Sequence, residues 1–270
     1  MVQGAARGGQ RVLSFWPHSA ATVSPGGLSI RTIAIVLIAA CAHSASAAWP
    51  FDAIFTLGAP LWWLQTLALA TLVGALSRCA NVRHAAVLGL VFATVWLTGT
   101  FWWLFGSMHT YGGLNAVLST VAVLALAMAL AAYYAAACAL YWRVAQRQPR
   151  GATVLFAALW LMAEMARGTW LTGFGWGAVA YAHVDAPLAG YAPWVGAYGM
   201  TAMAAWLACA LAMVLSPAGQ VSRGRRALGL GLVMAGVLAL GALLPPAVPA
   251  WSHATGTLSV ALLQGNIAQD

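Results

Sequence analysis

Charged residues are scarce in this sequence, and lysine is absent. Of its 270 residues only 6% carry a charge, whereas 63% are hydrophobic. About a quarter of the residues of a soluble globular protein are charged, so this chain has too few charged side chains to cover a surface that faces water. Its basic residues, all arginines, lie in clusters between apolar segments, a pattern that suits membrane topology better than nucleic-acid binding. The composition therefore predicts an integral membrane protein.

The cysteines are few and give no sign of a metal site. Three of the four lie inside apolar segments, and Cys79 lies between two such segments. None forms a Cys-x-x-Cys motif or a Cys/His spacing. We therefore expect the cysteines to be packing residues, and we expect no metal ion, no disulfide framework and no other cofactor.

Long apolar runs dominate the rest of the sequence. A helix needs about 20 apolar residues to cross the hydrocarbon core of a bilayer. The candidate runs lie at about 30–48, 54–76, 85–106, 114–142, 150–166, 194–215 and 226–247. The sequence predicts an all-α bundle of about seven transmembrane helices within residues 30–250. Residues 1–29 are polar and rich in Gly, Ser and Pro, which is typical of a disordered tail.

The arginines predict an orientation in the membrane. Eleven of the twelve fall before or at the start of the first apolar run, or in or at the edge of the connections after the second, fourth and sixth runs, and the exception is Arg167. Connections rich in arginine stay in the cytoplasm. We therefore expect a cytoplasmic N-terminus, and an odd number of spans places the C-terminus outside.

The connection at about 167–193 has an unusual composition. It is long, apolar and aromatic, and two glycines let its backbone bend beside Phe174 and Trp176, before Tyr181. Long loops in compact proteins are usually functional, and irregular backbone at membrane depth must be buried in protein or face a wet cavity. We expect this segment to line a lipid or acyl site. Each ring could instead belong to the aromatic belt at the membrane interface.

Glu164 and Arg167 precede this connection. They are three residues apart and share one face of a helix, and Glu164 is the only glutamate in the chain. An ionisable residue inside an apolar run is costly and is normally paired. We interpret the two residues as a structural ion pair that fixes the loop to the helix, with a direct role in substrate binding as the alternative.

A second connection on the same predicted side carries His109 and Tyr111. They precede a Gly-Gly turn at 112–113. His109 could donate a hydrogen bond to a substrate, and Tyr111 could contact the same lipid. A capping or headgroup-contacting histidine is the alternative.

The last residues predict one strand. The apolar run at 258–267 is bounded by turn residues, which fits a buried strand. A single strand cannot stand alone because its edges are unpaired. We therefore expect residues 257–270 to begin a further domain outside the membrane, one that is otherwise missing from this chain.

These features together resemble the N-terminal membrane part of bacterial apolipoprotein N-acyltransferases. The likeness covers about residues 30–270 and is carried by four stretches in the family's order, namely Trp49-Pro50-Phe51-Asp52, Met108 to Gly113, Glu164 to Trp176 with Tyr181 to Pro187, and Val260 to Ile267.

The resemblance implies an activity at the outer face of the bacterial inner membrane. Members of this family move an acyl chain from a phospholipid to the N-terminal diacylglyceryl-cysteine of a lipoprotein. Their nitrilase-like α/β domain uses a Cys, a Glu and a Lys, in which the Cys thiolate takes the acyl chain as a thioester. The implied partners are a phospholipid donor, a diacylated lipoprotein acceptor and the membrane, without nucleic acid. The implied substrate contacts within this chain are Phe174, Trp176, Tyr181, His109 and Tyr111.

The sequence departs from the family pattern at the catalytic residues. It has no lysine, no cysteine follows Cys209, and Glu164 precedes the nitrilase-like domain. We therefore expect a membrane portion that contains none of the catalytic residues and is inactive by itself. The alternative is a transporter or lipid-binding membrane protein that works alone, although the spans show neither paired inward charges nor an internal repeat.

Overall fold

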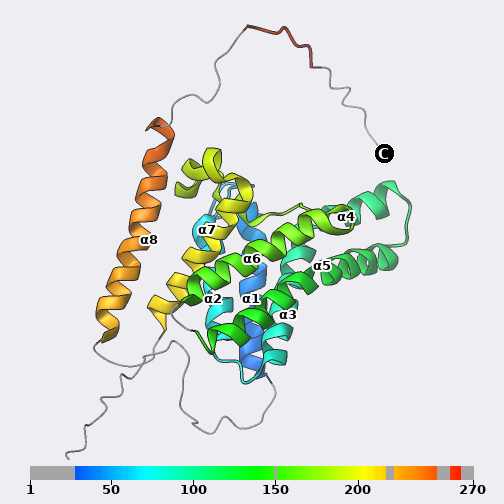
Figure 1. The fold of residues 1–270 in the computed structure, drawn as a ribbon. Coiled ribbons are helices and arrows are strands. Elements are labelled where there is room, and N and C mark those ends of the chain that lie inside the picture. The colour runs from blue at the N-terminus through cyan, green and yellow to red at the C-terminus, as the bar shows by residue number, and fades with distance from the viewer. Residues whose placement is uncertain (1–27, 149–150, 217–221, 248–255, 263–270) are drawn as a thin grey trace, which may run out of the picture.

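The computed structural model describes residues 28–148, 151–216, 222–247 and 256–262, and within these ranges all regular structure is helical. Seven helices have at least 15 residues and form the body of the protein (Figure 1). They are α1 (Ile30–Ala47), α2 (Trp62–Leu76), α3 (Val82–Thr100), α5 (Ala116–Ala145), α6 (Ala152–Thr169), α7 (Ala192–Leu215) and α8 (Ser222–Ala247). The shorter helices are α4 (Trp103–Gly106), η1 (Ser107–Tyr111), η3 (Trp170–Thr172), η4 (Val179–His183) and η5 (Pro187–Tyr191).

Polar side chains begin several of these helices. Ser29 accepts a hydrogen bond from the Thr32 amide at 3.1 Å, and Asn81 accepts one from the His84 amide at 2.9 Å. Asn115 caps the longest helix, α5, in the same way. Each cap satisfies an amide that has no partner within the helix. The caps therefore fix where the apolar runs enter helical structure.

Five helices are long and apolar enough to cross a membrane. These candidate spans are Ile30–Ala47, Val82–Thr100, Ala116–Ala145, Pro187–Leu215 and Ala227–Leu244. The predicted count of seven is therefore met in part. The second predicted run is apolar but its helix has only 15 residues, and the fifth falls short in hydropathy because α6 contains Glu164 and Arg167.

The second predicted span, 54–76, begins later than expected. Residues 50–61 form an irregular segment that closes on itself through hydrogen bonds from the Trp49 amide to the Ala59 carbonyl and from the Gly58 amide to the Trp49 carbonyl. Gly58 has φ of 80°, which favours glycine. Turn-forming residues at Gly58 and Pro60 therefore delay α2 until Trp62.

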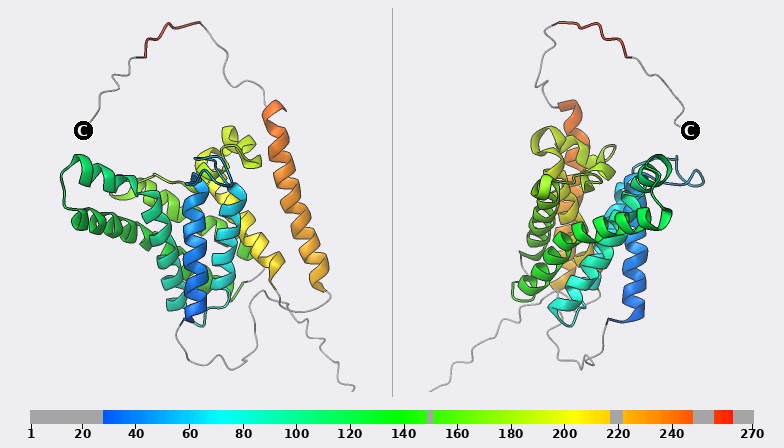
Figure 2. Two further views of the ribbon diagram at one scale, coloured as in Figure 1. Left: turned by 180° about the vertical axis from the view of Figure 1, so that it is seen from behind. Right: turned by 90° about the vertical axis from the view of Figure 1, so that its right-hand side faces the viewer.

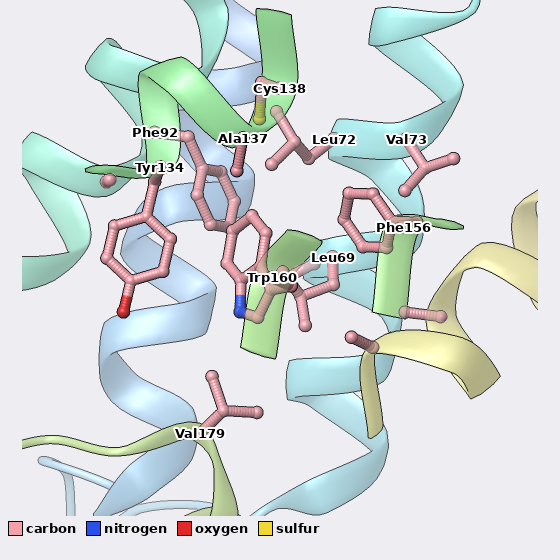
Figure 3. Packing of buried hydrophobic residues seen from close by; sticks show 14 of the residues in the cluster. Leu69, Leu72, Val73, Phe92, Tyr134, Ala137, Cys138, Phe156, Trp160 and Val179 are labelled. Atoms are coloured by element: carbon pink, nitrogen blue, oxygen red, sulfur yellow. The ribbon is translucent and has the colours of Figure 1, made fainter. Parts of the chain in front are cut away.

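The core of the bundle is aromatic and closely packed (Figure 3). Trp160 of α6 lies at its centre, with ring centroids of Tyr134 at 4.9 Å and Phe156 at 5.4 Å. Helices α3 and α5 approach so closely at Gly89 that a Cβ there would lie 2.8 Å from the Cys138 side chain. Small residues permit such close packing between membrane helices. Cys138 is thus a packing residue, as predicted for all four cysteines, whereas Cys41 is exposed.

Helix α8 lies beside the bundle rather than within it (Figures 1 and 2). It packs mainly against η5 and α7. The Tyr191 hydroxyl donates a hydrogen bond to the Val237 carbonyl oxygen at 2.7 Å. At Gly241 a Cβ would lie 2.2 Å from the Pro187 carbonyl oxygen, so only glycine allows this approach. The helix is therefore attached by its second half, while most of its apolar surface is exposed.

Successive long helices alternate in direction. The C-terminal ends of α1, α3 and α6 lie at one end of the bundle, and the C-terminal ends of α2, α5 and α7 lie at the other (Figures 1 and 2). Residues 256–262 are exposed and have no regular structure, so the described part of the predicted strand at 258–267 is not in a sheet. Residues 263–270 and residues 1–27 of the predicted tail at 1–29 lie outside the described residues.

Candidate functional site

Arg167, in the last turn of α6, holds the loop that follows it. The side chain is fully buried. Its Nε donates to the Tyr134 hydroxyl at 3.0 Å, and its Nη1 donates to the carbonyl oxygens of Phe174 and Trp176, both at 2.7 Å. Hydrogen bonds from a charged donor are stronger than neutral ones. This arginine therefore folds residues 174–176 back onto the end of α6.

Glu164 binds the same loop further along. One carboxylate oxygen accepts a hydrogen bond from the Thr201 hydroxyl at 2.8 Å, and the other accepts one from the Val179 amide at 3.3 Å. The described residues contain no direct salt bridge between Glu164 and Arg167, in contrast to the predicted ion pair. The carboxylate and the guanidinium share a helix face, but they form hydrogen bonds with different partners: Glu164 with Val179 and with Thr201 of α7, and Arg167 with other parts of the loop and with α5. Each of the two buried charged side chains thus binds the loop through its own hydrogen bonds.

The loop needs glycine to follow this path. Gly173 has φ of 76°, and a Cβ at this position would lie 2.2 Å from the Gly168 carbonyl oxygen. The next residue, Phe174, donates its amide to the Arg167 carbonyl at 2.8 Å, and its ring packs against Phe101 with centroids 4.8 Å apart. Phe174 is therefore directed toward the core, beneath the loop.

A cavity of about 370 Å³ opens between the loop and the start of α7. Pockets of roughly 300 to 1,000 Å³ are the usual size for small ligands. Its lining combines the buried Glu164 and Arg167 with the exposed rings of Trp176, Tyr181 and Tyr198, and also includes Gly175, Ala178 and Ala197. The cavity is thus lined by two buried charged side chains and by exposed aromatic rings.

The two other predicted site residues belong to a separate segment. His109 and Tyr111 lie in η1 and are exposed, and neither lines the cavity. The Nδ1 of His109 donates to the Leu114 carbonyl oxygen at 2.8 Å, which closes its own connection. The connection after α3 does contact the loop elsewhere, because the rings of Trp103 and Trp176 lie 5.7 Å apart. The structure therefore brings Trp176 and Tyr181 to the cavity and leaves His109 and Tyr111 beside it.

Sequence patterns gave no sign of Tyr134 and Thr201, the partners of the two charged residues. Both lie inside long apolar runs, where a lone hydroxyl looks like packing. A second buried polar group, also unpredicted, joins the loop to α2, where His183 Nε2 donates to Gln65 Oε1 at 3.1 Å. Burial lowers the pKa of His183 to about 4, so it is neutral near pH 7. Among the described residues no group of three or more His, Cys, Asp or Glu could hold a metal ion.

A bundle of apolar helices that carries a charged pocket at one end defines a multi-pass membrane protein. The profile of the apolipoprotein N-acyltransferase N-terminal domain family matches residues 45–211, which include every residue of the cavity. The chain therefore belongs to this family.

Named relatives agree with the family match. The chain is 48% identical over 245 residues to an apolipoprotein N-acyltransferase of Verminephrobacter eiseniae. The aligned region covers 87% of this chain and 44% of the relative. The chain is 41% identical over 213 residues to that of Ralstonia nicotianae (77% and 39%) and 36% identical over 251 residues to that of Chromobacterium violaceum (92% and 46%). The chain thus spans less than half the length of these relatives.

Proposed function

We propose that this chain is the membrane part of an apolipoprotein N-acyltransferase of the bacterial inner membrane. In this role it helps to transfer an acyl chain from a phospholipid to the N-terminal diacylglyceryl-cysteine of a lipoprotein. The family match carries the proposal, because it spans the segment that forms the charged cavity. The acyl transfer itself requires a nitrilase-like domain, of which residues 257–270 are the proposed beginning.

The proposed topology has seven spans, with a cytoplasmic N-terminus and a periplasmic C-terminus. Helix α2 at about 22 Å and α6 at about 27 Å approach the thickness of the hydrocarbon core, and the self-closed segment before α2 supplies the remaining depth. The C-terminal ends of α1, α3 and α6 share one end of the bundle, and those of α2, α5 and α7, which precede the arginine-rich connections in the sequence, share the other. Both features support alternating spans.

Reporter fusions test this topology. A reporter that is active only in the periplasm should be active when fused after residue 250 and silent when fused near Arg147. The opposite pair of results would exclude the proposed orientation, and activity at both positions would exclude an odd number of spans between the two fusion positions.

At the cavity, we propose that Trp176 and Tyr181 contact the acyl donor on its path to the reaction site, and that Phe174 supports them from below. His109 and Tyr111 are proposed to contact the same lipid from the neighbouring segment. The exposure of rings in both segments supports this, since the side chain of Trp176 is 60% and that of Tyr111 is 64% exposed. Rigid aromatic rings at a lipid-facing opening suit contact with glycerol and acyl chains.

A chimera tests the function. Residues 1–270 would replace the matching part of the Verminephrobacter eiseniae relative, and lipoprotein N-acylation would be measured in cells depleted of their own enzyme. We expect the chimera to restore acylation and residues 1–270 alone to fail, because this chain lacks the Cys, Glu and Lys that the family uses. An inactive chimera that is well expressed, or acylation by residues 1–270 alone, would contradict the proposal.

Trp176→Ala in the chimera tests the site. We expect acyl transfer to fall by about 100-fold at normal expression, since misplacement of a substrate by about 1 Å has such an effect. The matched control is Trp194→Ala, because Trp194 is similarly exposed and does not line the cavity. If both variants acylate as fast as the parent, Trp176 is only a membrane anchor.

A further inference from the structure

A groove lies between α2 and α7 at the end of the bundle opposite the cavity. It has a volume of about 150 Å³ and is lined by the last turns of both helices. On α2 it extends from Leu67 to Arg78, about 15 Å at the rise of a helix, and on α7 from Ala212 to Ser216. Pockets for small ligands usually begin at about 300 Å³. The groove is therefore suited to one segment of a chain molecule rather than to a whole compact ligand.

Most of the groove is apolar, and its end carries a charge. Leu67 and Leu215 are exposed on its two sides, and the small residues Ala70 and Gly74 leave room between the helices. Arg78 lies at the end of the groove, just past the last turn of α2. The Arg78 side chain is exposed, and among the described residues it takes part in no hydrogen bond or salt bridge. The groove therefore joins an apolar wall to an open cationic donor.

No carboxylate in the described structure lies near Arg78 to balance its charge. The described acidic residues lie toward the other end of the bundle, in the connections after α1 and α6 and in the last turns of α6 (Figure 1), and they are Asp52, Asp185 and Glu164. Two further exposed arginines, Arg83 and Arg147, share the end where Arg78 lies. The counter-charge is therefore supplied from outside these residues. An anion that carries an apolar chain complements both parts of the groove.

We propose that this groove binds an anionic phospholipid of the cytoplasmic leaflet, with its phosphate at Arg78 and part of one acyl chain between α2 and α7. Basic pockets between membrane helices on the cytoplasmic side are typical sites for anionic head groups. The bound lipid is a structural partner of the bundle and not a substrate, because the cavity lies at the opposite end. The leaflet rests on the proposed topology, whereas the site does not.

Photo-crosslinking of residues 1–270 in mixed micelles with dodecyl maltoside tests the site. The probe is a phosphatidylglycerol with a diazirine in one acyl chain, and the comparison lipid is a phosphatidylcholine with the same chains. Mass spectrometry of the peptides locates the label. We expect the phosphatidylglycerol to label α2 and α7 along the groove about fivefold more than the phosphatidylcholine does, because one basic residue near a membrane surface favours an anionic lipid by about this factor.

Arg78→Gln and Arg83→Gln form a matched pair, because both arginines are exposed at the same end and only Arg78 lines the groove. We expect Arg78→Gln to lower labelling by the phosphatidylglycerol to the phosphatidylcholine level, and Arg83→Gln to leave it unchanged. Gly74→Leu fills the groove, since nothing lies within 4 Å of an added Cβ. Leucine favours a helix more than glycine does, so this variant should fold and should lose labelling of the groove by both lipids.

Three results would overturn the lipid site. They are equal labelling of the groove by the two lipids, equal labelling of Arg78→Gln and Arg83→Gln, and undiminished labelling of Gly74→Leu. A parent that shows no lipid preference and a dimer that Gly74→Leu dissociates would instead assign the groove to a second copy of the chain. None of these measurements uses acyl transfer. Loss of labelling in Arg78→Gln together with an inactive chimera would therefore reject the proposed function and keep the site.

Discussion

The two connections that follow α3 and α6 are alike in sequence and different in attachment. Both are aromatic, rich in glycine and placed at the same end of the bundle. The segment around η1 is closed by its own hydrogen bonds, such as those from Gly112 to Ser107 and from Leu114 to Met108. The loop after α6 is instead bound by buried charged side chains. Composition alone therefore does not distinguish a loop that is fixed by the core from one that is held locally.

Removing the arginine should break this difference. Arg167→Ala loses three hydrogen bonds and leaves Glu164 buried without a nearby cation. Hydrogen bonds to a charged group are each worth about 1.5–3 kcal/mol, so we expect a large loss of stability and a loop that proteases cleave. Unfolding of the detergent-solubilised protein by heat or denaturant measures the effect. Arg167→Lys should lose less, and an unchanged midpoint in Arg167→Ala would refute this account of the loop.

The glycines of the two connections provide the next comparison. Gly173→Ala places a Cβ against the Gly168 carbonyl in a backbone conformation reserved for glycine, and we expect it to cost about 3 kcal/mol. Gly113→Ala, at φ of 66° with open space around it, should cost about 1 kcal/mol. Gly175→Ala is the control, because its φ is not positive and nothing lies within 4 Å of the added Cβ. The order of the three unfolding midpoints checks this ranking.

Mild acid should loosen the fixed loop. Burial lowers the pKa of His183 from 6.5 to about 4, so the unfolded chain binds a proton at a pH where the native protein does not. Stability from this residue is complete above about pH 6.5 and declines as the pH falls towards 4, by about 2 kcal/mol at pH 5. Thermal unfolding between pH 7 and 5 measures the decline. We expect a shallower slope in His183→Asn.

The smallest stability effect is expected in the locally held segment. His109→Ala removes one hydrogen bond within an exposed turn, and surface changes of this kind usually alter stability by less than about 0.5 kcal/mol. If the proposed substrate contact exists, acyl transfer by the chimera should nevertheless fall. Equal activity and equal stability in His109→Ala would assign this histidine a capping role only.

The apolar runs predicted the helices better than their ends. A long run such as 114–142 has few alternatives to a helix, and α5 covers it. The second run failed at its start because Gly58 and Pro60, two residues in an otherwise apolar stretch, favoured a turn. At the candidate site, the spacing of Glu164 and Arg167 identified the two charges but not their partners. Tyr134 and Thr201 come from helices far away in the chain, and only the packing of α5 and α7 brings them to α6.

The docking of α8 on η5 also has a consequence for the order of assembly in the cell. This helix leaves the ribosome after the others, and its docking surface, at Pro187 and Tyr191, belongs to the connection that Glu164 and Arg167 hold in place. The earlier helices can thus complete their packing before α8 arrives, and α8 then docks on a finished platform. A fault in that connection would leave α8 inserted in lipid but undocked. Quality control would then meet a protein whose other helices are packed and whose α8 is not.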